Sequence, residues 1–250
     1  MPQSFEWVHA IPGLNLLPAH LAHTIIVMCI LVPLVWVASR KLRSPDLDVV
    51  PPTRFGALAF FELLYESLLD LATGILGHYA PRFLFLLGGL AVYILFSNLL
   101  GVIPGLAPPT DNINTTAACA LTVFVATHYY GVKSQGFAYL KQFVGPVVWL
   151  APLMIPIEII GHLARPLSLS LRLFGNMFGD HIVLAVFSFM TISLTKFLLS
   201  KSVVLWAFTP ITVLIPFVVV ILGIFVAVVQ TLVFLLLTMS YLAGSVADHH

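Results

Sequence analysis

The chain has 250 residues, of which 60% are hydrophobic and only 8% are charged, and its mean hydropathy is +1.06. Its apolar runs are far longer than the about 20 residues that span a bilayer, so no soluble domain is left over. The net charge of +1 is uninformative about partners, and no Lys/Arg block indicates nucleic acid. The sequence therefore predicts one all-α polytopic membrane domain over residues 1–250.

The first predicted span covers residues 19–39, which carry no formal charge. No basic segment precedes this span, so it does not have the pattern of a cleaved signal peptide. Arg40, Lys41 and Arg43 follow it at once, and the positive-inside rule places them in the cytoplasm. We therefore expect residues 1–18 to be an outer N-terminal segment.

The next predicted element is an amphipathic helix over residues 55–78. Glu62, Glu66 and Asp70 recur every four residues, while Leu64 and Leu68 lie away from them. This pattern is typical of a helix with one apolar and one polar face. We interpret it as a helix that lies on the cytoplasmic interface.

Residues 83–132 contain the second and third predicted spans, separated by the polar loop 104–116. Counted from an outer N-terminus, this loop lies outside and the basic residues at the far ends of both spans lie in the cytoplasm. Asp111, Asn112 and Asn114 are therefore candidates for the outer mouth of an ion path. The polarity expected of any exposed loop would produce the same residues.

Residues 147–246 form the last predicted element. Each of the two apolar stretches 147–195 and 203–246 would run about 65 to 75 Å as a continuous helix, twice the about 30 Å hydrocarbon core. The prolines lie near the starts of the stretches and in no polar turn cluster. A hairpin of two long, steeply tilted helices, joined around Lys196 to Ser202, fits better than four short spans. The C-terminus is then cytoplasmic.

Arg172 is the strongest candidate for a site residue. Between Pro166 and Thr195 the only charged side chains are Arg172 and Asp180. A guanidinium cannot lose its proton at accessible pH. An arginine at the bilayer centre costs about 2.5 to 3.5 kcal/mol, and such residues face a bundle interior or a water-filled path.

A ladder of polar side chains extends from this arginine. Ser168, Arg172, Asn176 and Asp180 recur every four residues, so on a helix they share one face. Glu158 lies on the same stripe, about 33 Å from Asp180 along the axis, which puts one carboxylate towards each membrane face. This arrangement suits two ion paths that do not meet. The alternative is an arginine that pairs with one of the carboxylates to hold a bundle together.

Two further side chains belong to the candidate site. Gln230 is expected to form a hydrogen bond across to the arginine helix. His181, next to Asp180, is the best candidate for proton handling, because an unperturbed imidazole titrates near pH 6.5. The other histidines are expected at interfaces or in solvent.

No pattern in the sequence indicates a cofactor or a metal site. Cys29 and Cys119 belong to no CxxC or Cys/His cluster, so both are predicted to be buried small side chains without a disulfide. No HExxH or GxSxG motif supports an intramembrane enzyme. A secondary transporter that binds an anionic solute through Arg172 is the alternative function. It predicts inverted repeats, and the sequence shows none.

The run SLSLRLFGNM over residues 168–177 resembles the subunit a family of the F-type ATP synthase. The similarity extends to NLLGVIP at 98–104, PPT at 108–110, NTT at 114–116, Glu158, and QTLVF at 230–234. It implies a non-catalytic stator subunit, without a nucleotide site, that forms two proton half-channels against a rotating c-ring. Arg172 would face the ring carboxylate. The implied partners are the c-ring, the peripheral-stalk subunit b and the other subunits, in a bacterial inner membrane.

Two positions depart from the family pattern. Bacterial relatives commonly have a glutamate nine residues after the arginine, where this chain has His181, preceded by Asp180. Some relatives have a histidine or glutamate seven residues before the glutamine, where this chain has Gly223. We expect Asp180 and His181 to act as the outer proton relay, with one of them facing the partner helix at Gly223.

Overall fold

The computed structural model describes residues 17–42, 56–103, 105–136, 139, 149, 151–201 and 209–246. Every regular element in these residues is a helix, which confirms the all-α class. The elements are α1 (Ala19–Leu42), α2 (Ala57–Leu76), the short η3 (Gly77–Tyr79), α3 (Ala80–Leu100), the short η4 (Pro109–Asp111), α4 (Ile113–Gln135), α6 (Ala151–Lys201) and α7 (Thr209–Val246). Most of the predicted outer segment 1–18 lies outside the described residues.

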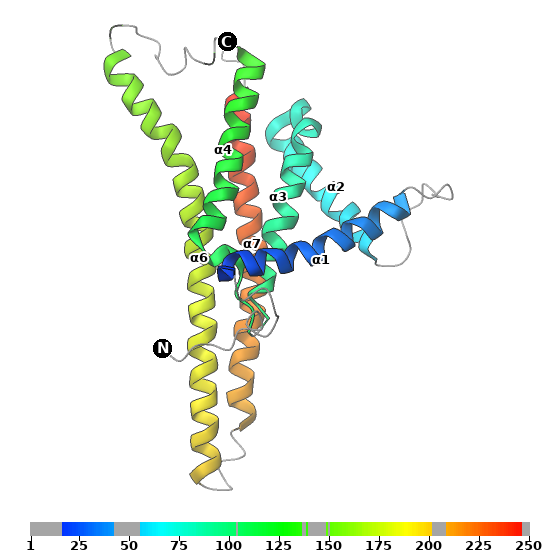
Figure 1. Ribbon diagram of the computed structural model, residues 1–250, viewed down its shortest axis with the longest axis vertical. Coiled ribbons are helices and arrows are strands. Elements are labelled where there is room, and N and C mark those ends of the chain that lie inside the picture. Colours follow the sequence, from blue (N-terminus) through cyan, green and yellow to red (C-terminus); the bar gives the residue numbers. More distant parts are fainter. Residues whose placement is uncertain are drawn as a thin grey trace.

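Two long helices dominate the molecule. α6 has 51 residues and α7 has 38, and they run side by side as a hairpin (Figure 1). Pro156 and Pro166 lie inside α6 without ending it. The helix continues to Lys201 rather than ending near Lys196, because no Gly or Pro interrupts these last turns.

The other helices pack against this hairpin. α4 contacts both α6 and α7, α3 lies along α7, and α2 packs on α3 and α7. α1 lies crosswise to the hairpin in Figure 1 and contacts α2, α3 and η4. α1 therefore reaches the loop between α3 and α4 from the side.

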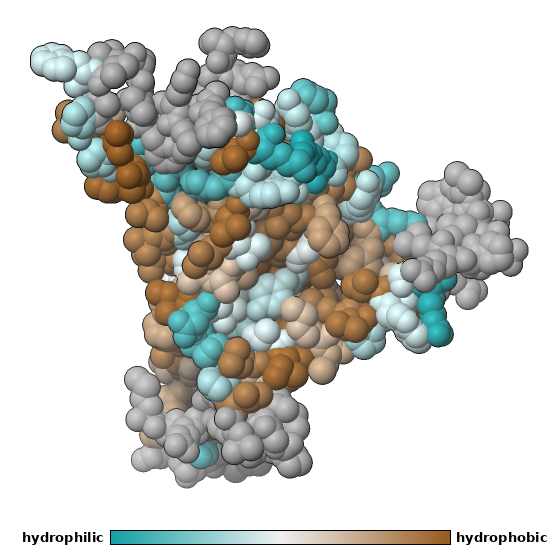
Figure 2. Space-filling view, turned by 45° about the horizontal axis from the view of Figure 1, so that its top comes forward, coloured by the Kyte–Doolittle hydropathy of each residue, from teal (hydrophilic) through white to brown (hydrophobic). Residues whose placement is uncertain are grey.

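Four helical stretches among the described residues are long and apolar enough to cross a membrane: 19–40, 58–100, 152–197 and 217–246. Apolar surface covers much of the face shown in Figure 2, and hydrophilic surface gathers in a band near its top. α4, the predicted third span, is not among the four stretches, because it carries many Thr, Asn, His and Tyr side chains. That α4 crosses the membrane stays a prediction.

α2 is amphipathic, as the pattern of its sequence indicates. Glu62, Glu66 and Asp70 are exposed, whereas Leu68 and Leu76 are buried. The apolar stretch continues through η3 into α3, so α2 and α3 form one hydrophobic run with a break at Gly77. Gly77 has a φ of 57°, a conformation that side chains with a Cβ rarely adopt.

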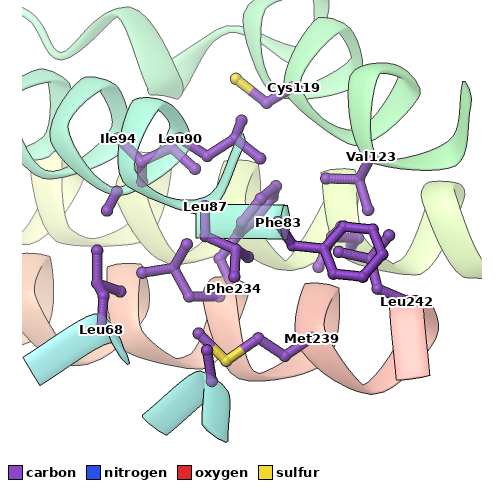
Figure 3. Close-up of a cluster of buried hydrophobic side chains, with 14 of the residues drawn as sticks. Leu68, Phe83, Leu87, Leu90, Ile94, Cys119, Val123, Phe234, Met239 and Leu242 are labelled. Carbon is purple, nitrogen blue, oxygen red and sulfur yellow. The ribbon is translucent and has the colours of Figure 1, made fainter. Parts of the chain in front are cut away.

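The core lies where α2, α3, α4, α6 and α7 meet (Figure 3). Phe83, Leu87 and Phe234 are almost fully buried there, and Leu173 of α6 packs into the same cluster. In a lipid environment such helices are held by close packing and interhelical hydrogen bonds rather than by exclusion of water. The two cysteines differ: Cys119 is buried in this core, whereas Cys29 is exposed on α1, so its predicted burial is wrong.

Hydrogen bonds from α1 and α3 hold the loop between α3 and α4. His23 Nδ1 donates to a backbone carbonyl one turn earlier at 2.7 Å, and its Nε2 accepts the backbone N–H of Ala107 at 3.2 Å. The Thr110 hydroxyl donates to Asn98 Oδ1 at 2.7 Å in the interior. The expected interfacial or solvent position of His23 is wrong, because the residue is only 1% exposed. The loop is thus fixed just before Asp111.

Candidate functional site

Arg172 lies on a part of α6 that the rest of the chain leaves uncovered. Its side chain is exposed, and so are the apolar side chains of Leu167 and Leu171 beside it. Leu169 and Leu173, on the other side of the helix, are buried in the core. The described residues contain no ion pair between Arg172 and either of the carboxylates on the same helix. An ion pair with Glu158 or Asp180 therefore does not hold Arg172 in place.

A carboxamide pair ties the two long helices together next to the arginine. Asn176 Nδ2 donates a hydrogen bond to Gln230 Oε1. Gln230 is buried, with 4% exposure, whereas Asn176 is exposed one turn beyond Arg172. The predicted hydrogen bond from Gln230 to the arginine helix is confirmed, and its partner is Asn176.

Three titratable side chains meet on the other side of Asn176. Asp180 faces α7, with its Oδ2 3.1 Å from where a Cβ on Gly223 would lie. His181 Nδ1 lies 3.4 Å from Asp111 Oδ2, which comes from the short η4 helix. The expectation that Asp180 or His181 faces Gly223 is confirmed for Asp180, and the role of the two residues as a relay stays a prediction. The carboxylate of Asp180 itself takes up the space that the glycine leaves. We call Asp111, Asp180 and His181 the acidic cluster.

The neighbouring candidates have varied surroundings. Asn112 is the N-cap of α4, and its side chain accepts the backbone N–H of Asn114 at 3.0 Å. Asn114 and Ser168 are exposed. Among the described residues, neither of them is hydrogen-bonded through its side chain to the acidic cluster. Capping is thus a structural role of Asn112 that its place in a polar loop did not reveal.

A second cluster of titratable groups lies on the opposite side of Arg172. Glu158 Oε1 is 3.3 Å from His162 Nε2, four residues further along α6. The ring of His128 on α4 lies 5.2 Å from that of His162, measured between centroids. His162 is only 4% exposed, so its expected interfacial or solvent position is wrong. The i, i+4 spacing of Glu158 and His162 was the signal in the sequence that could have revealed this pair.

The two clusters flank the arginine along one helix. At about 1.5 Å per residue, Glu158 lies about 21 Å before Arg172 and Asp180 about 12 Å after it. Between the arginine and the acidic cluster is the Asn176–Gln230 pair. No group of three or more His, Cys, Asp or Glu side chains that could hold a metal occurs within the described ranges. The arrangement can accept and release protons on both sides of a fixed positive charge.

The fold and the site define a class: a polytopic helical membrane protein in which titratable side chains follow a long helical hairpin past one exposed arginine. Ionisable groups in membrane helices mark ion paths and proton relays.

Comparison with known proteins identifies the family. The family model described as ATP synthase A chain matches residues 21–243. "ATP synthase subunit a 1" of Syntrophotalea carbinolica is 44% identical over 231 residues, which cover 92% of this chain and 87% of the relative. "ATP synthase subunit a" of Trichlorobacter lovleyi is 41% identical over 91% of this chain and 86% of the relative. The same subunit of Geobacter sulfurreducens is 41% identical over 90% and 86%. The chain belongs to the ATP synthase subunit a family.

This result confirms the resemblance found at residues 168–177. The chain is a multi-pass membrane subunit of an F-type ATP synthase. The alternative of a secondary transporter for an anionic solute is not favoured, because the similar proteins are subunits of an ATP synthase.

Proposed function

We propose that this chain forms two proton half-channels against a rotating c-ring, with Arg172 facing the ring carboxylate. The observation that carries the proposal is the position of Arg172. It is a permanent cation on the uncovered face of α6, and titratable clusters lie on both sides of it along the same helix.

The uncovered face of α6 supports a partner inside the membrane. In an apolar 18-residue window of Pro152–Phe197, only 6% of the residues are buried within the chain, so lipid or another subunit must cover the others. The hydrocarbon of the bilayer cannot neutralise a guanidinium, whereas a carboxylate on a passing helix can. At about 4 Å the pair gains on the order of 4 kcal/mol at an effective dielectric of 20. That energy lowers the pKa of the ring carboxyl by about three, which drives release of its proton.

The acidic cluster supports an outer half-channel. Asp111 brings a carboxylate from the polar loop to His181, and Asp180 continues the series along α6 towards Arg172. Asn112 and Asn114 lie at the start of the mouth. Ser168 and Asn176 extend the polar stripe on both sides of the arginine, and Gln230 positions Asn176.

Glu158 belongs to the inner half-channel, on the other side of Arg172. Because the arginine separates the two paths, a proton crosses the membrane only when the ring turns. Each proton then contributes roughly 2.3 kcal/mol per 100 mV of membrane potential. No nucleotide is bound on this chain, and ATP is made on other subunits.

The assembly follows from the same proposal. The partners are the c-ring, the peripheral-stalk subunit b and the other subunits of the complex. The chain lies in a bacterial inner membrane with its N-terminus outside and its C-terminus in the cytoplasm. The basic residues Arg40 and Lys41 at the end of α1 support this orientation by the positive-inside rule.

The test is to replace Arg172 in the complete complex and to measure ATP-driven proton pumping in inverted membrane vesicles. Arg172→Ala is expected to abolish pumping while the complex stays assembled, because only a fixed charge forces the ring carboxyl to release its proton. Arg172→Lys should restore little, since a buried ammonium can lose its proton.

Arg82→Ala is the control, since Arg82 lies at the start of α3 and its guanidinium rests over the Tyr130 ring, which belongs to neither cluster. This variant should pump at the parental rate. Normal pumping by Arg172→Ala, with assembly verified by co-purification of the ring, would overturn the proposal.

A further inference from the structure

A small cavity between α4, α6 and α7 lies on the Glu158 side of Arg172. Its lining combines ionisable with apolar side chains: Thr127, His128, His162, Arg165, Leu169 and Tyr241. Two imidazoles in the wall of one cavity inside membrane helices are costly to bury, and ionisable groups kept there mark proton paths. The ionisable lining of the cavity therefore indicates a function.

The hydrogen bonds of His128 define which of its nitrogens can take up a proton. Its Nδ1 lies 2.9 Å from the backbone carbonyl oxygen of Phe124. A carbonyl oxygen can only accept, so Nδ1 carries the hydrogen. In the neutral ring Nε2 then has the free lone pair. His128 is thus prepared to accept a proton at Nε2.

His162 connects this ring to a carboxylate. Its ring centroid is 5.2 Å from that of His128, and its Nε2 is 3.3 Å from Glu158 Oε1. The Glu158 side chain is 37% exposed whereas that of His162 is 5% exposed. The series therefore runs from the buried cavity to a carboxylate that is partly exposed on α6.

The remaining groups around the pair do not compete for the proton. Arg165, one turn after His162, is always charged and its guanidinium rests over the Tyr241 ring at 5.7 Å. The Tyr139 ring lies 6.0 Å from that of His128. Burial raises the pKa of the Tyr139 hydroxyl above its ordinary value, so this group stays protonated near neutral pH.

We infer that His128 and His162 form the buried proton-transfer step of the inner half-channel and deliver the proton to Glu158. This inference rests on the proposed function and names the carriers of its second path. A neutral ring accepts a proton from the cavity side, and His162 passes one on to the Glu158 carboxylate, which releases it to solvent. Each ring is neutral again after every transfer.

The experiment measures ATP-driven proton pumping, in which the same steps run in reverse from Glu158 to His128, by the intact complex in inverted vesicles, as a function of pH on the cytoplasmic side. His162→Gln keeps a polar side chain that cannot titrate, and it should lower the rate by about a hundredfold, the lower end for a positioned proton-transfer group. His162→Glu should recover much of the rate, with a changed pH profile, because a carboxyl at this position titrates in a different pH range from an imidazole. A merely structural role would not produce this recovery with a shifted pH profile.

His78→Gln is the matched control, since His78 is an exposed histidine in η3 and should give the parental rate and profile. If His162 variants fail to assemble, His128→Gln tests the same step from α4, where the side chain is less buried. Parental rates and pH profiles in the assembled glutamine variants would overturn the inference. Arg172→Ala in the same series separates the two proposals: if it stops pumping while His162→Gln does not, only the histidine step is wrong.

Discussion

At the scale of single residues, the site depends on which side chains α7 leaves room for. Gln230 is buried and bonds to Asn176, and Gly223, seven residues earlier on the same helix, accepts the carboxylate of Asp180. These two contacts hold two polar side chains of α6 against α7, so their directions are set by the partner helix. Arg172 lies between Ser168 and Asn176 on the polar stripe and takes part in neither contact, so its side chain stays exposed.

The acidic cluster leads us to predict that Asp180 and His181 share one role in proton transfer. Single changes Asp180→Asn and His181→Leu should each slow proton pumping without uncoupling it from ATP hydrolysis, because the other group still titrates. The double change should nearly stop pumping, and Asp180→Asn with His181→Glu should restore it by returning an acid to the usual family position. Pumping by vesicles together with their ATPase rate provides the measurement. A double neutral variant that pumps at the parental rate would show that the relay lies elsewhere.

Because Asp180 lies close to Gly223, we predict that a larger side chain at position 223 disturbs proton pumping. In Gly223→Ala the new Cβ would lie 3.1 Å from Asp180 Oδ2, so the carboxylate must move by a few tenths of an ångström. We expect the rate of proton pumping to fall by about 5- to 150-fold, which corresponds to a free-energy change of about 1–3 kcal/mol.

Gly89→Ala on α3 is the matched control, since nothing lies within 4 Å of a Cβ there. It should leave the rate of proton pumping unchanged. Equal rates in the two variants would mean that the position of the Asp180 carboxylate does not matter for transport.

At the scale of elements, the loop between α3 and α4 links the crosswise helix α1 to the site. Ala107 is bonded to His23 and Thr110 to Asn98, and the next residue, Asp111, contacts His181. The loop is polar because it has to satisfy its own backbone and also to carry a carboxylate to α6. Loop polarity and the proposed channel function are therefore compatible.

This link predicts that α1 controls how firmly the loop is held. His23→Leu removes the acceptor for the Ala107 N–H, which costs about 1–3 kcal/mol for a buried donor. A single cysteine at position 107, with Cys29 and Cys119 replaced by alanine, should then react with a thiol reagent roughly 5- to 150-fold faster. His20→Leu, a half-buried ring one turn earlier on α1, should leave the labelling rate unchanged. The same rate in His23→Leu would show that the loop is held by other contacts.

At the scale of the whole molecule, the long hairpin carries the site and the shorter helices support it. α6 is covered on one side by α4 and α7 and is open on the other, which is where Arg172 lies. An apolar helix of 51 residues is about 76 Å long, so it fits a membrane only when strongly tilted. The tilt and the orientation of the termini remain predictions.

The two ends of α4 provide a test of orientation. Asn114→Cys and Lys133→Cys, each exposed and about 28 Å apart along the helix, are made in a background without native cysteines. A membrane-impermeant thiol reagent should label position 114 from the outside of intact cells and position 133 only from the cytoplasmic face in inverted vesicles. The opposite pattern would mean that the chain is inserted with its N-terminus inside.

Hydrophobicity and helical spacing were enough to predict the all-α class, the long hairpin, the polar stripe through Arg172 and the exposed carboxylates of α2. Such features depend on neighbours within one helix, where spacing alone decides which side chains share a face. The partners across helices came only from the tertiary structure: Asn176 for Gln230, Asp111 for His181, and His128 for His162. His23 and His162 were expected at interfaces or in solvent, yet both are buried. The physical reason is that burial depends on which helix packs against a residue, and the order of residues along one helix does not contain that information.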